Sequence, residues 1–239
     1  MNQIALWRRL IAEFLGSAFL AAIVIGSGIA AQQLSPGNIG LELLENALAT
    51  GAGLFAIILM FASVSGAHFN PVVSLADAAF GGISWRDASA YIPAQIAGCI
   101  TGAISANVMF SLAAVSMSTH HRATGPHLFS EGIATIGLLL VIFSLAKTGR
   151  SSITPGAVAA YITAAYFFCS STSFANPAIT VGRMFSNTFA GIAPSSVLPF
   201  IGAQLLAALI AVLLIHLLFP GITPTEAEEI FTPVYEQGA

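Results

Sequence analysis

The sequence predicts an all-α membrane protein in which six transmembrane helices and two re-entrant half-helices form an inverted repeat. Three observations lead to this prediction. Of the 239 residues, 56% are apolar and only 7% are charged, and the mean hydropathy is +0.88. A soluble domain has about 25% charged residues, so this composition suits lipid surroundings. The other two observations are an Asn-Pro dipeptide that occurs twice within apolar sequence, and polar residues that recur in both halves.

A transmembrane helix needs about 20 apolar residues, and the chain has room for six of them. Turn sequences rich in Gly, Pro, Asn and Ser separate the apolar stretches. We expect spans at roughly 8–31, 42–63, 88–111, 127–147, 155–171 and 197–219, with half-helices at 70–80 and 176–186. The first span is too long for the apolar core of a signal peptide and contains Glu13, so we expect it to be retained.

The two Asn-Pro dipeptides are Asn70-Pro71 and Asn176-Pro177. Asn is a favoured residue just before a helix, and Pro fits the first helical position because its missing N–H would be unsatisfied there. Non-helical backbone deep in a membrane is tolerated only where it is buried in protein or lines a watery cavity. Interrupted helices at matching places in two halves therefore indicate a solute site near the membrane midplane.

Each half has a glutamate in its first span, Glu13 or Glu131, and a glutamine in its last span, Gln95 or Gln204. Because each half would hold three spans, an odd number, the second half is inserted upside down. The half-helices then enter from opposite faces and meet with their N-termini together. Each has about ten residues and would be about 15 Å long, so the pair would cover the hydrocarbon core of about 30 Å.

The meeting point of the half-helices would favour uncharged solutes. The positive dipole ends of both helices repel cations, protons included. The side-chain oxygen of each asparagine caps its own helix, which leaves the NH₂ group as a donor only. A water molecule that accepts from both Asn70 and Asn176 could not accept from a neighbouring water, so a proton-conducting chain would be interrupted. We therefore expect a small neutral molecule rich in hydroxyl groups.

We expect one channel domain over residues 1–222, with repeats at about 8–111 and 127–219 and a polar cytoplasmic tail at 223–239. Basic residues predict that both termini lie in the cytoplasm, because the positive charges then gather on the inner face. The residues expected inside are Arg8, Arg9, Arg86, Lys147 and Arg150, and those expected outside are Arg122 and Arg183.

The boxes at residues 65–72 (SGAHFNPV) and 171–178 (STSFANPA), together with Glu13 and Glu131, resemble the aquaporin (major intrinsic protein) family over essentially the whole chain. The resemblance implies a channel through each subunit of a homotetramer in a bacterial inner membrane. It implies that the two glutamates brace the re-entrant loops, and that the protein is neither an enzyme nor the holder of a cofactor or metal. The net charge of −3 argues against a nucleic-acid partner.

Most members of that family have Arg directly after the second Asn-Pro-Ala, whereas this chain has Ile179. The other positions of the outer constriction, carried over by their distance from each asparagine, are Thr50, Ala164 and Ser173. Small and aliphatic side chains at these positions predict a wider, less polar ring than the aromatic, His and Arg groups of water-selective members. We therefore expect a solute larger than water.

Two further residues each have two possible roles. His68 lies two residues before Asn70, where it could offer its backbone carbonyl to the pore or simply pack within the loop. Arg183 follows Ile179 by one helical turn, where it could reach the vestibule or pack against a loop or a neighbouring subunit.

The constriction without Arg, together with residues 163–166 (TAAY) and 171–179 (STSFANPAI), resembles the bacterial aquaglyceroporin branch associated with arsenic resistance. That resemblance implies downhill movement of arsenite as neutral As(OH)₃, which is similar to glycerol in size and hydroxyl display. Glycerol, urea and antimonite remain alternatives, as does a general glycerol and water facilitator. An ion-coupled transporter usually needs an intramembrane charge at its site, and Glu13 and Glu131 lie at the bracing positions instead.

Overall fold

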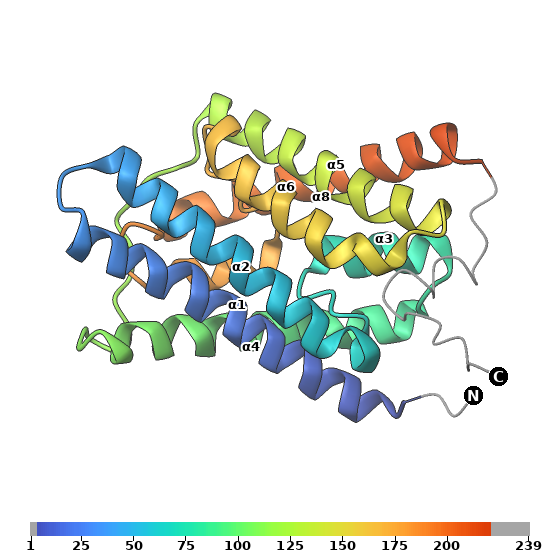
Figure 1. Cartoon of the computed structure of the whole chain (residues 1–239), viewed down its shortest axis with the longest axis horizontal. Coiled ribbons are helices and arrows are strands. Elements are labelled where there is room, and N and C mark those ends of the chain that lie inside the picture. Colours follow the sequence, from blue (N-terminus) through green and yellow to red (C-terminus); the bar gives the residue numbers. More distant parts are fainter. Residues whose placement is uncertain (1–3, 221–239) are drawn as a thin grey trace.

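The computed structural model describes residues 4–220, over which the chain forms eight α-helices, one short 3₁₀ helix and no strand (Figure 1). The longer helices are α1 (Leu6–Leu34), α2 (Ile39–Ser65), α4 (Trp85–Met109), α5 (Gly125–Lys147), α6 (Thr154–Phe168) and α8 (Pro194–Leu218). The shorter elements are α3 (Pro71–Phe80), the 3₁₀ helix η1 (Ser151–Ile153) and α7 (Pro177–Arg183). The expected tail at 223–239 lies outside the described residues.

Five of the described helices, α1, α2, α4, α5 and α8, are long and apolar enough to cross a membrane by length and composition. The remaining expected span, at 155–171, corresponds to α6, which has 15 residues and directly follows η1. Each half of the chain also contains one short helix that begins at an Asn-Pro dipeptide. The predicted all-α membrane fold is therefore confirmed.

The second half-helix differs from its expected length of about ten residues, because α7 has only seven and ends at Arg183. The next two residues close tight turns, since Met184 N donates to Val181 O and Phe185 N donates to Gly182 O. Directly after them, the Ser186 hydroxyl donates to Asn107 Oδ1 at 2.6 Å. These contacts tie the chain to the end of α4 and stop the helix there.

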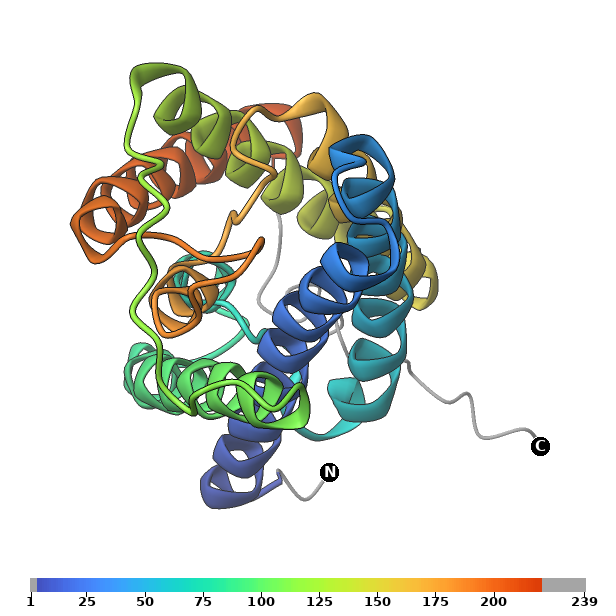
Figure 2. The same ribbon diagram turned by 90° about the vertical axis from the view of Figure 1, so that its left-hand side faces the viewer.

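The helices surround a centre that holds α3, α7 and the loops leading into them (Figure 2). In the first half α1 packs against α2 and α4, while in the second half α5 packs against α6 and α8. The halves join where α2 meets α6 and where α7 packs against α4. The α3 helix lies in the part of the bundle nearest the two ends of the described chain (Figure 1). Helix α7 approaches it from the opposite side, and the two touch.

Small residues let α1 and α4 approach closely. A Cβ atom on Gly98 would lie 2.2 Å from Phe14 O, and one on Gly102 would lie 2.1 Å from Ala18 O. Both contacts are with backbone atoms, so a larger residue at either position would force the helices apart. This is the expected use of glycine between membrane helices, where packing rather than water exclusion holds neighbours together.

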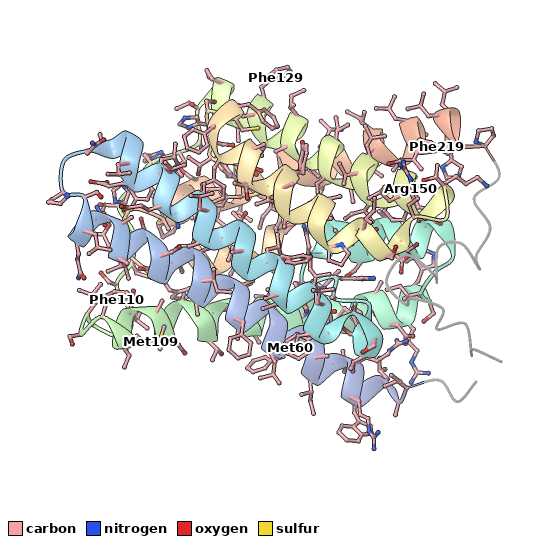
Figure 3. All side chains as sticks on the ribbon, viewed as in Figure 1. Met60, Met109, Phe110, Phe129, Arg150 and Phe219 are labelled. Atoms are coloured by element: carbon pink, nitrogen blue, oxygen red, sulfur yellow. The ribbon has the colours of Figure 1, made fainter. Side chains whose placement is uncertain are left out.

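The bundle is apolar outside and has its strongly polar groups inside. Large apolar side chains project from its outer surface, among them Met60, Met109 and Phe129 (Figure 3). In contrast, Glu13 and Glu131 are completely buried. This distribution is the reverse of that in a soluble domain and suits a protein whose outer face meets lipid.

Candidate functional site

The two re-entrant loops meet at the asparagines that precede α3 and α7. Asn70 Nδ2 donates to Ala175 O at 2.8 Å, and Asn176 Nδ2 donates to Phe69 O, also at 2.8 Å. Each asparagine thus binds the backbone of the opposite loop, although the two loops are more than a hundred residues apart in sequence. The structure brings together the two residues that the sequence places at the start of the half-helices.

Both asparagines cap their helices through the side-chain oxygen. Asn70 Oδ1 accepts from Val72 N at 3.1 Å, and Asn176 Oδ1 accepts from Ala178 N at 2.9 Å and from Ile179 N at 3.3 Å. The NH₂ group of each side chain has two N–H donors. One donor binds the opposite loop, which the sequence reasoning missed, and the second has no hydrogen-bond partner within residues 4–220.

A buried carboxylate holds the first loop in place. Glu13 is completely buried and accepts four hydrogen bonds, from the hydroxyl of Ser65, from His68 N and Phe69 N, and from Gln95 Nε2. The donor distances lie between 2.6 and 3.0 Å. Intramembrane carboxylates need partners of this kind, because an unpaired charge in the bilayer is costly.

The second loop has the equivalent arrangement. Glu131 is also completely buried, and it accepts from Phe174 N and Ala175 N at 2.8 Å each and from Gln204 Nε2 at 2.7 Å. In both halves, therefore, the recurring glutamate accepts from the recurring glutamine and from the backbone of the loop.

These anchors fix an unusual backbone conformation. Five residues of the two loops that are not glycine have positive φ angles between +47° and +64°, namely Ala67, Phe69, Thr172, Ser173 and Ala175. Such left-handed backbone is unfavourable for residues with a side chain and persists only where surrounding contacts impose it. The hydrogen bonds to Glu13 and Glu131 supply such contacts.

One cavity touches both asparagines and residues of both halves. Most of its wall is aliphatic, with contributions from α1, α2, α5 and α6, among them Val24, Leu54, Ile58, Leu138, Ile142 and Ile162. The polar side chains on this wall are few: Thr50, His68, Asn70, Tyr166, Ser173, Asn176 and Arg183. An apolar wall with a few placed donors is typical of a site for a small molecule.

Three of the four expected constriction residues, Thr50, Ser173 and Ile179, line this cavity. The prediction for Ala164 is wrong, because this residue is exposed on the outer side of α6 and is absent from the cavity wall. Tyr166 lies on the wall instead, with its hydroxyl 3.1 Å from Thr50 Oγ1.

The error at Ala164 has a geometric cause. Counting back from Asn176 crosses the irregular loop between α6 and α7, whose path cannot be read from residue spacing. A helix turns by about 100° per residue, so an error of two residues moves a side chain to the far side. The sequence did carry a signal for Tyr166 as a wall residue. A buried tyrosine in an apolar helix usually finds a polar partner for its hydroxyl.

His68 packs its ring against polar side chains of α3 and belongs to the cavity wall. Its Nδ1 lies 3.0 Å from the hydroxyl of Ser74, and its Nε2 lies 3.4 Å from Asp77 Oδ2. Asp77 is an intramembrane carboxylate on α3 with only 2% of its surface exposed. Sequence reasoning missed the contact between His68 and Asp77. The available signal was a carboxylate on the short apolar helix that follows His68, because such a group needs a polar partner.

Arg183 both packs and reaches the cavity. Its side chain is 2% exposed, its Nε donates to Ala190 O, and its guanidinium carbon lies 3.4 Å from the centre of the Phe174 ring. The residue also contributes to the cavity wall.

Other reactive side chains do not gather in a ligand set. Within residues 4–220, no three His, Cys, Asp or Glu side chains form a group able to hold a metal ion. Cys99 and Cys169 are buried free thiols. In the loop before α5, burial and the nearby Arg122 lower the pKa of His120.

Comparison with known proteins agrees with this geometry. The chain matches the family model described as "Major intrinsic protein" over residues 1–175. It is 43% identical over 224 residues to "Aquaglyceroporin AqpS" of Rhizobium meliloti (strain 1021), and the match covers 94% of this chain and 95% of that protein. It is 38% identical over 108 residues to the "Glycerol uptake facilitator protein" of Pseudomonas aeruginosa, covering 45% of this chain and 37% of that one.

A solved structure has the same fold. The X-ray structure of the aquaglyceroporin from Plasmodium falciparum superposes with a TM-score of 0.67 and covers 93% of this chain and 99% of its own. The sequence identity is 22%, so this likeness concerns the fold alone.

Proposed function

This chain belongs to the major intrinsic protein family, and we propose that within it the chain conducts small neutral polyhydroxylated solutes, foremost As(OH)₃ and glycerol-like molecules, together with water. The family resemblance predicted from the two Asn-Pro boxes is confirmed by the match over residues 1–175. Its relatives are passive channels rather than enzymes. The observation that supports the proposal best is that Asn70 and Asn176 share one cavity with an aliphatic wall.

The asparagines favour a neutral passenger. Each has one N–H bound to the opposite loop and one left for a solute oxygen. Aliphatic side chains around them offer no competing hydrogen bonds. A cation at this point would face the positive ends of two helices, which makes its passage unfavourable.

The constriction supports a solute larger than water. Ile179 brings a neutral aliphatic side chain to the wall, to which Thr50, Tyr166 and Ser173 contribute hydroxyl groups. Arsenite at neutral pH is As(OH)₃, which presents three hydroxyl groups in a volume similar to that of glycerol. The similarity to a protein named aquaglyceroporin supports this solute class.

Substituting Ile179→Arg tests the proposal. A long cationic side chain would narrow this part of the cavity, so flux of glycerol and As(OH)₃ in proteoliposomes should fall about tenfold, a change of about 1.4 kcal/mol. Water flux should fall less, because water is smaller. Ile179→Leu keeps the size and apolarity of the side chain and serves as the matched control. Unchanged solute flux in Ile179→Arg would remove this residue from the constriction.

The same flux assay separates the alternatives. A general glycerol and water facilitator would conduct glycerol while As(OH)₃ moved no faster than through protein-free vesicles. An ion-coupled transporter would show solute flux that depends on a proton or sodium gradient.

We further propose that residues 1–222 form one channel domain of a homotetramer in a bacterial inner membrane. The cytoplasmic placement of both termini rests on the distribution of basic residues. Near the start of α1, Arg9 forms an ion pair with Asp87 of α4 at 2.5 Å, which joins the ends of two helices expected on the cytoplasmic face.

A further inference from the structure

We propose that Arg183 is a specificity-determining residue of the outer pore, whose terminal nitrogens bind the oxygen atoms of a polyhydroxylated solute. This inference rests on the proposed channel function and concerns how the pore chooses among solutes. Helix α7 begins beside Asn176 and ends at Arg183. The backbone of Arg183 therefore lies about one helical turn beyond Ile179, farther from the asparagine pair.

The side chain has donors that the protein does not use. A guanidinium has five N–H donors. The Nε donor binds Ala190 O, while within residues 4–220 the two terminal nitrogens have no hydrogen-bond partner. These two nitrogens are not completely buried, because they are absent from the set of fully buried polar atoms without a partner. Since the side chain lines the cavity and is only 2% exposed, its spare donors face the solute path.

The ring of Phe174 holds the guanidinium in one orientation. The guanidinium carbon lies 3.4 Å from the ring centre, and Phe174 is itself fixed because its backbone N donates to Glu131 at 2.8 Å. Stacking of this kind orients the planar group and leaves its edge free for hydrogen bonds. The donors are therefore positioned before a solute arrives.

A neighbouring arginine, Arg122, already holds the loop at residues 189–191, so Arg183 is not needed for that structural role alone. Arg122 Nε donates to Gly191 O at 2.7 Å and Nη2 donates to Phe189 O at 3.0 Å. These carbonyls belong to the same loop that Arg183 binds, and Arg122 also lies 5.5 Å from the centre of the Phe174 ring. Arg122 does not line the cavity, so it holds the loop without facing the solute.

The outer pore therefore acts in two stages. A neutral ring that includes Thr50, Tyr166 and Ile179 limits size. Arg183, farther out, replaces part of the water shell that a solute with several oxygens must shed. Hydrogen bonds from a charged donor are stronger than those from a neutral one. A polyol or trihydroxide gains more from this site than a single water does.

The test compares glycerol and water flux in proteoliposomes that contain the full chain. In Arg183→Met the ratio of glycerol to water permeability should fall about tenfold, because a charge-assisted hydrogen bond is lost. Arg183→Lys keeps the charge without the planar group and should give an intermediate ratio. Arg122→Met is the matched control and should keep the wild-type ratio. An unchanged ratio in Arg183→Met, or an equal fall in Arg122→Met, would overturn the proposal.

A second measurement uses only the wild-type protein. It tests the role of Arg183 even if the Arg183→Met variant cannot be reconstituted into vesicles. Nitrate is a planar oxyanion that matches the guanidinium edge, so it should inhibit glycerol flux through the wild-type channel. Chloride at the same ionic strength should not inhibit it. Equal flux in the two salts would overturn the role of Arg183 and leave the channel function intact. Wild-type vesicles without any glycerol flux would instead contradict the channel function itself.

Discussion

A Glu13→Ala channel is expected to lose its ordered first re-entrant loop and all solute flux with it. The substitution leaves four buried donors without their acceptor, two of them backbone N–H groups of the loop. Each stranded donor costs about 1–3 kcal/mol. The sum is comparable with the total stability of a typical protein, which is about 5–15 kcal/mol. Thermal unfolding in detergent and glycerol flux in proteoliposomes measure the two effects.

Glu42→Ala is the matched control for this prediction. Glu42 is a helix glutamate that is only 6% exposed, but it accepts from Gly37 N near a turn rather than from a re-entrant loop. Its removal should lower the unfolding temperature slightly and leave flux nearly unchanged. If Glu13→Ala behaved like Glu42→Ala, the carboxylate would not be what orders the loop.

An Asn176→Asp channel is expected to conduct cations. Aspartate caps a helix as well as asparagine does, so α7 should still form. The new carboxylate, however, places a negative charge where the positive ends of two helices meet. Its attraction for a monovalent cation 4 Å away is about 4 kcal/mol at an effective dielectric constant of about 20. We therefore expect sodium conductance in planar bilayers to rise by at least about a hundredfold.

Asn46→Asp is the control that shows whether a new carboxylate raises sodium conductance at any buried position or only beside the cavity. Asn46 is buried in α2, where its Nδ2 donates to Val24 O at 2.9 Å and to Ser27 Oγ at 2.7 Å, and it does not line the cavity. The same change there should leave conductance at the wild-type level. A conductance that stays at the wild-type level in Asn176→Asp would contradict the idea that the helix ends exclude cations.

The parts of the site that follow a repeated pattern were predictable from the sequence. Asn70 and Asn176 were identifiable because the residue before a helix has a strong local preference and because the dipeptide recurs. Glu13 and Glu131 were identifiable because a carboxylate in an apolar span demands a partner. Both inferences rest on local chemistry that a linear sequence carries.

The parts that depend on distant contacts were not predictable. Ala164 was assigned to the pore by counting through an irregular loop, and the structure has Tyr166 there instead. The crossed hydrogen bonds of the asparagines join residues far apart in the chain. The early end of α7 at Arg183 depends on contacts with the end of α4. Each of these features is set by tertiary packing, on which local sequence patterns are silent.

An experimental map at high resolution in the presence of glycerol would show directly whether the two asparagines bind the solute. We expect a glycerol oxygen about 3 Å from the Nδ2 atoms of both Asn70 and Asn176, within one continuous path. A path that bypasses the two asparagines, or protein that fills the space between them, would contradict this expectation.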